Sequence, residues 1–224
     1  MENIIVVGSS GHATVVIDTI EKMAEKQGLY KIVGLIDDFR QVGEKTWEYK
    51  ILGKIEDLPR LVDEYSSPNI AIAIGDNCGR KMVAEKIHQH CPAVHFPCVV
   101  HPKNAIGRNV SIGEGTFVGP QVRIAPDCRI GKFCNLLATL NIGHGVMMED
   151  FCSIAPGAAI GGDVKIGLAT AISMGVIINQ RIIVGEYTVI GTGSTVVRDI
   201  PSNVVAYGSP AKIIRSRKPE DKYL

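Results

Sequence analysis

A repeat of six residues runs through the second half of the chain and constrains its fold more than any other feature. Every sixth residue from Ile106 to Val196 is apolar, which gives sixteen positions that we call the anchors. Neither an α-helix nor an ordinary β-strand has a period of six, so the repeat predicts a stack of equivalent coils. The anchors are Ile106, Ile112, Val118, Ile124, Ile130, Leu136, Ile142, Met148, Ile154, Ile160, Ile166, Ile172, Ile178, Val184, Ile190 and Val196.

Three hexapeptides make one coil of a triangular prism in this interpretation, with the anchors stacked along the inside. Sixteen anchors give about five coils, or roughly 25 Å at the spacing of adjacent strands. Glycine often follows an anchor, as at Gly107 and Gly143, and we expect it to accept left-handed backbone angles at the corners. Cys128, Cys134 and Cys152 precede anchors by two residues, so we expect buried free thiols that pack as small apolar side chains. The period is lost after Arg198, and segment 200–212 is expected to leave the prism.

The first hundred residues alternate between short β-branched runs and amphipathic stretches. This alternation is typical of an open parallel sheet with helices on its faces. The predicted fold is therefore an α/β Rossmann-like amino-terminal sheet followed by an all-β parallel β-helix. We place the boundary near Pro102, with one domain over 1–101 and another over 102–224. Strands are expected at 4–7, 31–36 and 69–74, and helices at about 13–26, 55–65 and 80–90.

Three loops at 8–12, 37–38 and 75–77 follow the predicted strands. Ligands of open parallel sheets bind beyond the carboxyl ends of the strands, so the three loops are expected to meet in one crevice. Gly8 and Gly11 allow a tight turn before a helix amino terminus, which favours a phosphate, although the complete GxGxxG is absent. Asp37 and Asp38 are positioned to accept hydrogen bonds from ribose or a base. A glycine turn without a ligand and a solvated acidic turn are the plainer alternatives for these two loops.

The amino-acid composition excludes several classes of binding partner. The 224 residues contain 24 basic and 23 acidic side chains, which gives none of the positive charge typical of nucleic-acid or membrane-surface binding. No apolar run is long enough to span a membrane and no signal peptide is evident, so we expect a cytoplasmic protein. His144 is the one histidine inside the repeat, with His101 at its start. A zinc site of three histidines, as in carbonic anhydrases that share the prism, is therefore not expected, and neither is any other metal.

Several motifs together resemble a known family. The Gly8–His12 loop, the Asp37-Asp38 pair, Ala73–Asn77, the hexapeptides and Gly208–Lys212 are similar to those of hexapeptide-repeat sugar acetyltransferases. These enzymes modify bacterial surface sugars and include UDP-4-amino-sugar N-acetyltransferases and sialic acid O-acetyltransferases. The resemblance covers essentially the whole chain and implies a left-handed β-helix and a homotrimer, with acetyl-CoA between neighbouring prisms. It also implies that the amino-terminal domain binds the nucleotide-sugar.

The resemblance further implies roles for individual residues. The general-base histidine of the family corresponds to His144, and Gly162 corresponds to the donor of an oxyanion N–H. The residues that would bind the nucleotide-sugar are Ser10, Gly11, His12, Asp37, Asp38 and Gly75. The residues that would contact acetyl-CoA are Ser153, Gly162, Met174 and Thr192.

A single histidine suffices for the chemistry, because attack of an amine or hydroxyl on a thioester requires a base and an oxyanion donor. In many members an acidic residue adjoins this histidine, whereas here Gly143 and Gly145 flank it. A residue that orients His144 must then lie elsewhere, with Asn135, Asn141, Asp150 or a backbone carbonyl as candidates.

The leading hypothesis is transfer of an acetyl group from acetyl-CoA to the amino group of a nucleotide-linked sugar, with a UDP-4-amino sugar favoured. O-acetylation of a sialic acid or similar sugar is the alternative within the same class. A non-catalytic trimeric scaffold that binds a nucleotide-sugar is the alternative of another class.

Overall fold

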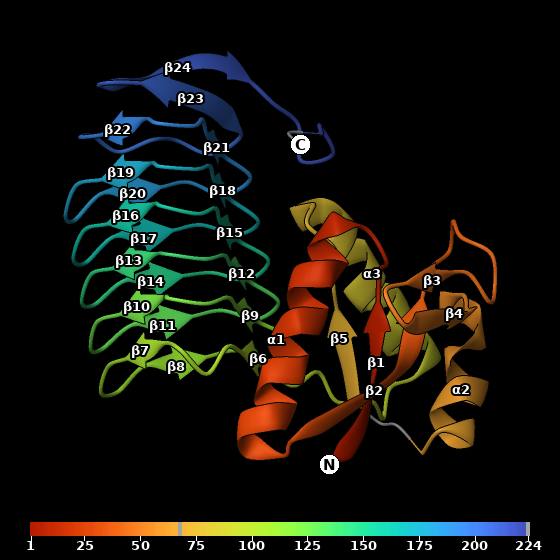
Figure 1. The fold of residues 1–224 in the computed structure, drawn as a ribbon. Coiled ribbons are helices and arrows are strands. Elements are labelled where there is room, and N and C mark those ends of the chain that lie inside the picture. The colour runs from red at the N-terminus through yellow and green to blue at the C-terminus, as the bar shows by residue number, and fades with distance from the viewer. Residues whose placement is uncertain (67–68, 223–224) are drawn as a thin grey trace.

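The chain folds into an α/β sheet domain beside a tall triangular prism. The computed structural model describes residues 1–66 and 69–222. Figure 1 shows the prism standing next to the sheet domain, with the short strands β6, β9, β12 and β15 on the side that faces helix α1. No helix within these described residues combines the length and the hydropathy that a bilayer span requires.

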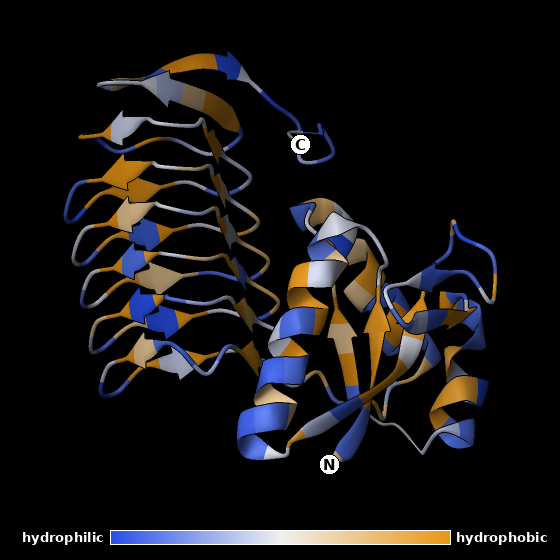
Figure 2. Cartoon of the chain, viewed as in Figure 1, coloured by the Kyte–Doolittle hydropathy of each residue, from blue (hydrophilic) through white to orange (hydrophobic). Residues whose placement is uncertain are grey.

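The amino-terminal sheet has the strand order β3-β4-β2-β1-β5. The central strands β1 (Glu2–Val7), β2 (Tyr30–Ile36) and β5 (Asn69–Ile72) are parallel to one another. Their side chains alternate between two apolar cores, since Ile4 and Val6 pack with α1 (Gly11–Gln27) on one face. Ile5 and Val7 pack with α2 (Leu58–Glu64) and α3 (Asn77–His90) on the other face. Figure 2 shows these central strands as hydrophobic.

The predicted strands and helices are present, with shifted ends and one addition. Strand β5 stops at Ile72 instead of residue 74, and α3 begins at Asn77 because the Asp76 side chain accepts a hydrogen bond from the Gly79 N–H at 2.6 Å. Segment 55–65 consists of a 3₁₀ turn, η1 (Ile55–Asp57), followed by α2. The hairpin of β3 (Lys45–Thr46) and β4 (Tyr49–Gly53) was not predicted, because neither strand is a long apolar run.

The hexapeptides form three parallel sheets, as the repeat predicts. Each strand from β7 (Ala105–Ile106) and β8 (Ser111–Ile112) to β21 (Val189–Ile190) and β22 (Thr195–Val196) has two residues and ends on an anchor. Strands pair with those 18 residues away, so three hexapeptides make one coil of the left-handed β-helix. The strand orders are β22-β19-β16-β13-β10-β7, β20-β17-β14-β11-β8 and β24-β23-β21-β18-β15-β12-β9-β6. The anchors from Val118 to Val196 form one continuous core.

The expected reason for glycine after the anchors is wrong. Left-handed backbone occurs three residues after an anchor, and side chains as large as Phe133 (φ 52°) and Arg181 (φ 60°) adopt it. The glycine directly after an anchor is required by the coil above instead. A Cβ on Gly107 would lie 2.7 Å from the nitrogen of Pro126, and one on Gly143 would lie 2.6 Å from that of Gly162. Glycine therefore sets how closely the coils stack, since interiors are packed without spare space.

Both ends of the prism extend beyond the region of the anchors. Strand β6 (Val99–Val100) pairs with β9 (Phe117–Val118) of the prism, although it precedes the domain boundary predicted near Pro102. The position of that boundary stays a prediction. The expectation that segment 200–212 leaves the prism is wrong. Strand β23 (Val204–Gly208) pairs with β21, and β24 (Ala211–Ser216) folds back on β23.

The buried cysteines behave as predicted. All six cysteines of the chain are free. Cys128, Cys134 and Cys152 are fully buried, and each thiol approaches a backbone carbonyl of the next coil, for example that of Gly143 at 3.0 Å from Cys128 Sγ.

Candidate functional site

The three loops at the strand ends converge on one pocket of about 460 Å3. Ser10, His12, Asp37, Asp38 and Gly75 all line it, as their positions in the sequence predicted. Gly11, the first residue of α1, does not line the pocket. The remaining lining residues are Val7, Gly8, Ser9, Ile36, Phe39, Ile55, Ala73, Ile74, Asp76 and Val83.

Gly8 explains how the loop reaches this position. Its φ of 109° lies in the region that favours glycine, and a Cβ there would approach the carbonyl oxygen of Ala73 to 2.7 Å. The turn after β1 can therefore pass directly over the end of β5. Ser10 and His12, at the amino terminus of α1, line this pocket, and a helix amino terminus favours an anion.

The two carboxylates of the acid pair are held by different parts of the protein. Asp37 accepts hydrogen bonds from the Ser9 hydroxyl and, at 2.9 Å, from the Phe39 N–H. Asp38 accepts from the Ile55 N–H at 2.9 Å and from Lys86 Nζ at 3.2 Å. Each carboxylate has about four acceptor positions, so both retain capacity for a ligand. Sequence reasoning missed Ser9 and Lys86, although Ser9 belongs to the glycine loop.

A second pocket of about 370 Å3 lies where the prism faces the sheet domain. Three of the four residues that the resemblance assigned to acetyl-CoA line it, namely Ser153, Met174 and Thr192. Ser153 belongs to β15 (Ser153–Ile154), whereas Met174 and Thr192 are in the turns after β18 (Ala171–Ile172) and β21. Its other lining residues are His12, Gly75, Asn135, Leu137, Ala155, Pro156, Ala171, Ile172 and Ser173.

His12 and Gly75 line both pockets and thus form a shared wall. The imidazole of His12 packs edge-on against Phe117, with the ring centroids 5.6 Å apart. Burial, followed by the nearby charge of Arg80, lowers the pKa of His12 to about 4, against a smaller opposing effect of Asn135. His12 is therefore neutral at physiological pH, and its Nε2 has no hydrogen-bond partner among the described residues.

Arg80 fixes this wall to the prism. Its fully buried guanidinium donates to the carbonyls of Ile74 and Gly75, at 2.8 and 2.9 Å. It also donates to the carbonyls of Phe133, at 2.7 Å, and Phe151, at 3.0 Å, which belong to two successive coils. One side chain thereby joins the loop after β5 to the corner of the prism. The sequence shows Arg80 only as one of many charged residues on a helix, so this role could not be predicted.

His144 lies at a different corner of the prism from the second pocket. It follows β13 (Asn141–Ile142) and precedes β14 (Met147–Met148), in the turn between the six-stranded and five-stranded sheets. Met174 and Thr192 are in turns between the eight-stranded and six-stranded sheets. In Figure 1 the β13–β14 turn is on the side away from the sheet domain. The His144 side chain is 69% exposed, so it is open to a ligand or a second copy of the chain.

The residue beside His144 is Asp163, which sequence reasoning missed. His144 Nδ1 is 3.8 Å from Asp163 Oδ1. Of the residues predicted to orient the histidine, Asn135 instead donates to the Ile74 carbonyl at 3.1 Å and Asn141 accepts from Arg123 at 3.2 Å. Asp150 likewise accepts from the Lys132 N–H. The 18-residue period of the coils could have revealed Asp163, because residues 162 and 163 lie one coil above residues 144 and 145.

The positions around His144 require glycine for different structural reasons. The imidazole lies over Gly162, where a Cβ would be 2.7 Å from His144 Nε2. Gly145 has a φ of 65°, and a Cβ there would be 2.3 Å from Asp163 Oδ1. The Gly162 N–H makes no hydrogen bond to another residue in the described part of the chain. Gly162 thus belongs to the His144 corner and not to the second pocket.

No group of three or more His, Cys, Asp or Glu within residues 1–66 and 69–222 is arranged to hold a metal ion. The chemistry that these residues offer is proton transfer by His144 and hydrogen bonding by backbone N–H groups. An exposed imidazole next to a carboxylate is suited to removing a proton from an incoming nucleophile.

Comparison with known proteins agrees with this architecture. The PglD N-terminal domain family matches residues 3–87. A mutant perosamine N-acetyltransferase from Caulobacter crescentus, in complex with CoA and GDP-perosamine, superposes with a TM-score of 0.88 at 26% identity, over 96% of this chain and 98% of that one. No curated protein sequence matches the chain significantly.

Two further structures share the fold. The acetyltransferase domain of PglB from Neisseria gonorrhoeae, in complex with acetyl coenzyme A, has a TM-score of 0.83 at 24% identity, over 95% of this chain and 99% of that one. WeeI from Acinetobacter baumannii has a TM-score of 0.82 at 24% identity, over 96% and 100%. Together with the domain match and the sixfold repeat, the full-length similarity shows that the chain has a PglD-type amino-terminal domain and shares its overall fold with hexapeptide-repeat sugar acetyltransferases.

Proposed function

We propose that the protein transfers an acetyl group from acetyl-CoA to the amino group of a nucleotide-linked amino sugar. The observation that carries this proposal is the pair of adjoining pockets with His12 and Gly75 in their common wall. A nucleotide-sugar in the first pocket and a thioester in the second would meet at that wall. The solved relative from Caulobacter crescentus, which is complexed with CoA and GDP-perosamine, supports the same pairing of ligands.

In this proposal Ser10 and Gly75 contact the pyrophosphate and sugar, and Gly11 contributes only as the first residue of α1 beside them. Asp37 and Asp38 accept hydrogen bonds from the nucleoside. Ser153, Met174 and Thr192 contact acetyl-CoA. Neutral His12 forms part of the wall at which the two ligands meet.

His144 acts as general base in this mechanism. It removes the proton from the amine as the nitrogen attacks the thioester carbonyl, and the Gly162 N–H stabilises the oxyanion of the tetrahedral intermediate. Collapse of that intermediate expels CoA as the thiolate, which takes up a proton. No covalent enzyme intermediate is needed, because donor and acceptor bind side by side.

A second copy of the chain completes the site, since His144 and the second pocket are on different corners of one prism. We propose the homotrimer that the resemblance implies, with His144 of one copy at the acetyl-CoA groove of its neighbour. Outward side chains of the upper coils support such an interface, because Ile177 and Ile183 are about half exposed. Figure 2 shows β19 (Ile177–Ile178) and β20 (Ile183–Val184) as hydrophobic, in contrast to the hydrophilic β10 (Arg123–Ile124) and β11 (Arg129–Ile130).

The test is release of CoA thiol from acetyl-CoA with UDP- and GDP-linked 4-amino sugars, beside the same sugars with a hydroxyl in place of the amine. Turnover with an amino sugar and roughly 100- to 10,000-fold less in His144→Ala is expected, the range for loss of a general base. Preference for UDP over GDP stays a prediction that the same panel measures. His90→Ala, at the exposed end of α3, is the matched control.

Absence of turnover with every acceptor would contradict the proposal and favour a binding scaffold. Turnover with hydroxyl acceptors alone would favour O-acetylation. Unchanged turnover in His144→Ala would remove this residue from the mechanism.

A further inference from the structure

Phe39 is an aromatic side chain with almost no protein around it. It follows the acid pair, lines the first pocket, and is 98% exposed. An isolated exposed apolar side chain is common on protein surfaces. An aromatic ring at the edge of a ligand pocket, beside two carboxylates, is a more specific arrangement.

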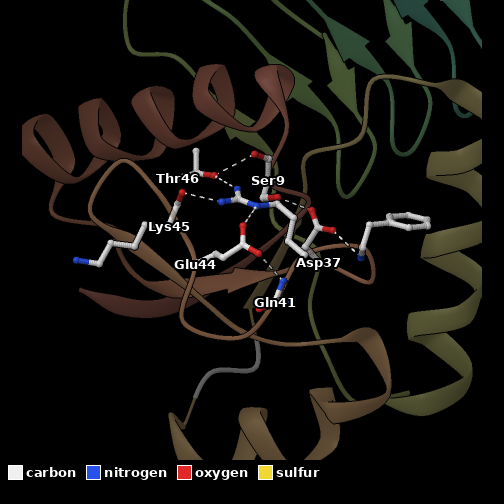
Figure 3. A network of polar contacts seen from close by, with 8 residues as sticks. Ser9, Asp37, Gln41, Glu44, Lys45 and Thr46 are labelled. Atoms are coloured by element: carbon white, nitrogen blue, oxygen red, sulfur yellow. Dashed lines mark hydrogen bonds and ion pairs between the residues drawn. The ribbon is translucent and has the colours of Figure 1, made fainter.

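A hydrogen-bond network holds the loop that carries Phe39. Arg40 donates to Glu44 at 2.9 Å, to Thr46 Oγ1 at 2.8 Å and to the Lys45 carbonyl at 2.9 Å. Thr46 in turn donates to the Ser9 carbonyl at 3.0 Å. Figure 3 shows Ser9, Asp37, Glu44 and Thr46 in this network, which ties the loop after β2 to the glycine loop after β1.

The backbone of Phe39 belongs to the same network. Its N–H donates to Asp37 Oδ1, while the other oxygen of Asp37 accepts from the Ser9 hydroxyl. The ring is therefore presented from a backbone that is fixed at its own residue and at both neighbouring turns. Such preorganisation reduces the entropy lost when a ligand packs on the ring.

The two ends of the pocket favour different parts of a nucleotide. The α1 amino terminus and the Gly8 loop attract negative charge, whereas the carboxylates of Asp37 and Asp38 repel it. Phosphate groups therefore belong at the glycine loop. A planar group with N–H donors suits the opposite end, since carboxylates accept hydrogen bonds and an aromatic ring stacks on a π-face.

We propose that Phe39 is the base-stacking residue of this site, which packs against the nucleobase while the adjacent carboxylates accept hydrogen bonds from the nucleoside. The inference rests on the proposed nucleotide-sugar site and adds a determinant of affinity that recognises the base and not the sugar. Its side chain contacts substrate without taking part in the chemical step.

Calorimetric titration of the full-length protein with UDP, GDP and a base-free sugar 1-phosphate tests this directly. Phe39→Ala is expected to weaken binding of the better nucleotide roughly 5- to 20-fold, within the range of base–aromatic stacking and towards its lower end because one ring face is available. Phe39→Trp is expected to retain the affinity, and Phe39→Leu to lose most of it. Binding of the sugar 1-phosphate and of acetyl-CoA should not change.

Val42→Ala is the matched control, because Val42 is in the same loop, is 68% exposed and does not line the pocket. Equal nucleotide affinity in Phe39→Ala and wild type would overturn the inference, and so would full affinity in Phe39→Leu. A changed oligomeric state in Phe39→Ala, measured by light scattering, with nucleotide affinity unaltered, would assign Phe39 to a subunit interface instead.

The outcomes separate this inference from the proposed function. If the wild-type protein binds a nucleotide but shows no acetyl transfer, the proposed reaction fails while Phe39 is still tested by binding. If the wild-type protein transfers acetyl groups and Phe39→Ala keeps an unchanged KM for the nucleotide-sugar, only the stacking role fails.

Discussion

His144 Nδ1 and Asp163 Oδ1 lie 3.8 Å apart, on adjacent coils of the prism. The acidic neighbour that is missing beside His144 in the sequence is thus supplied by the next coil. Gly145 and Gly162 leave the space in which the two side chains approach, whereas Gly143 allows the next coil to stack closely.

Asp163→Asn is expected to lower kcat roughly 2- to 10-fold with little change in KM, because the pair is partly exposed and such pairs contribute modestly. The measurement is steady-state thiol release. Asp127→Asn is the control, since Asp127 occupies the same left-handed turn position on the same corner and accepts from Asn109 instead. An equal loss in both variants would contradict a specific role for Asp163.

Gly162→Ala is expected to displace the His144 ring, because its Cβ would lie 2.7 Å from Nε2. A shift of this kind in a reacting group reduces turnover by roughly 100-fold. The variant should lose little thermal stability, because the exposed His144 side chain can move aside, and any loss should vanish in the His144→Ala background. A thermal loss that persists in the double variant would show that the clash is with backbone.

His12 makes stability depend on pH in a defined window. Its folded pKa of about 4 lies below the usual 6.5, so between these values the unfolded chain binds a proton that the native protein does not. Stability is then lost as pH falls from about 6.5 to about 4, by at most about 3 kcal/mol. Urea unfolding of wild type and His12→Gln at pH 7 and pH 4.5 measures it. The variant should show a smaller drop, and parallel losses would contradict the assignment.

Arg80→Met should destabilise the protein by about 3 kcal/mol or more, since it leaves buried carbonyls of both domains without a donor. Chemical denaturation measures the change. Arg60→Met is the control, because Arg60 is exposed and pairs with Glu64 along α2. A cost no larger than that of the control would mean that other contacts join the loop after β5 to the prism.

Much of the fold could be predicted because the sixfold period and the β-α alternation are local patterns. The convergence of the loops at Ser10, Asp37 and Gly75 also followed, since strands of a parallel sheet end at one edge. The hairpin at β3–β4 and the bonds of Arg80 could not be predicted, because they depend on tertiary contacts that no local pattern encodes. The proximity of Asp163 to His144 could have been predicted from the 18-residue period, because this period relates residues of successive coils.

The common wall formed by His12 and Gly75 has a consequence for inhibitor design. Because the two pockets adjoin there, a molecule that joins a nucleotide to a pantetheine-like arm could occupy both without a long linker. Its second half would then bind at a high effective concentration, and its affinity would exceed that of either fragment. The tether of such a bisubstrate compound would pass beside His12 and Gly75, the two residues that both pockets share.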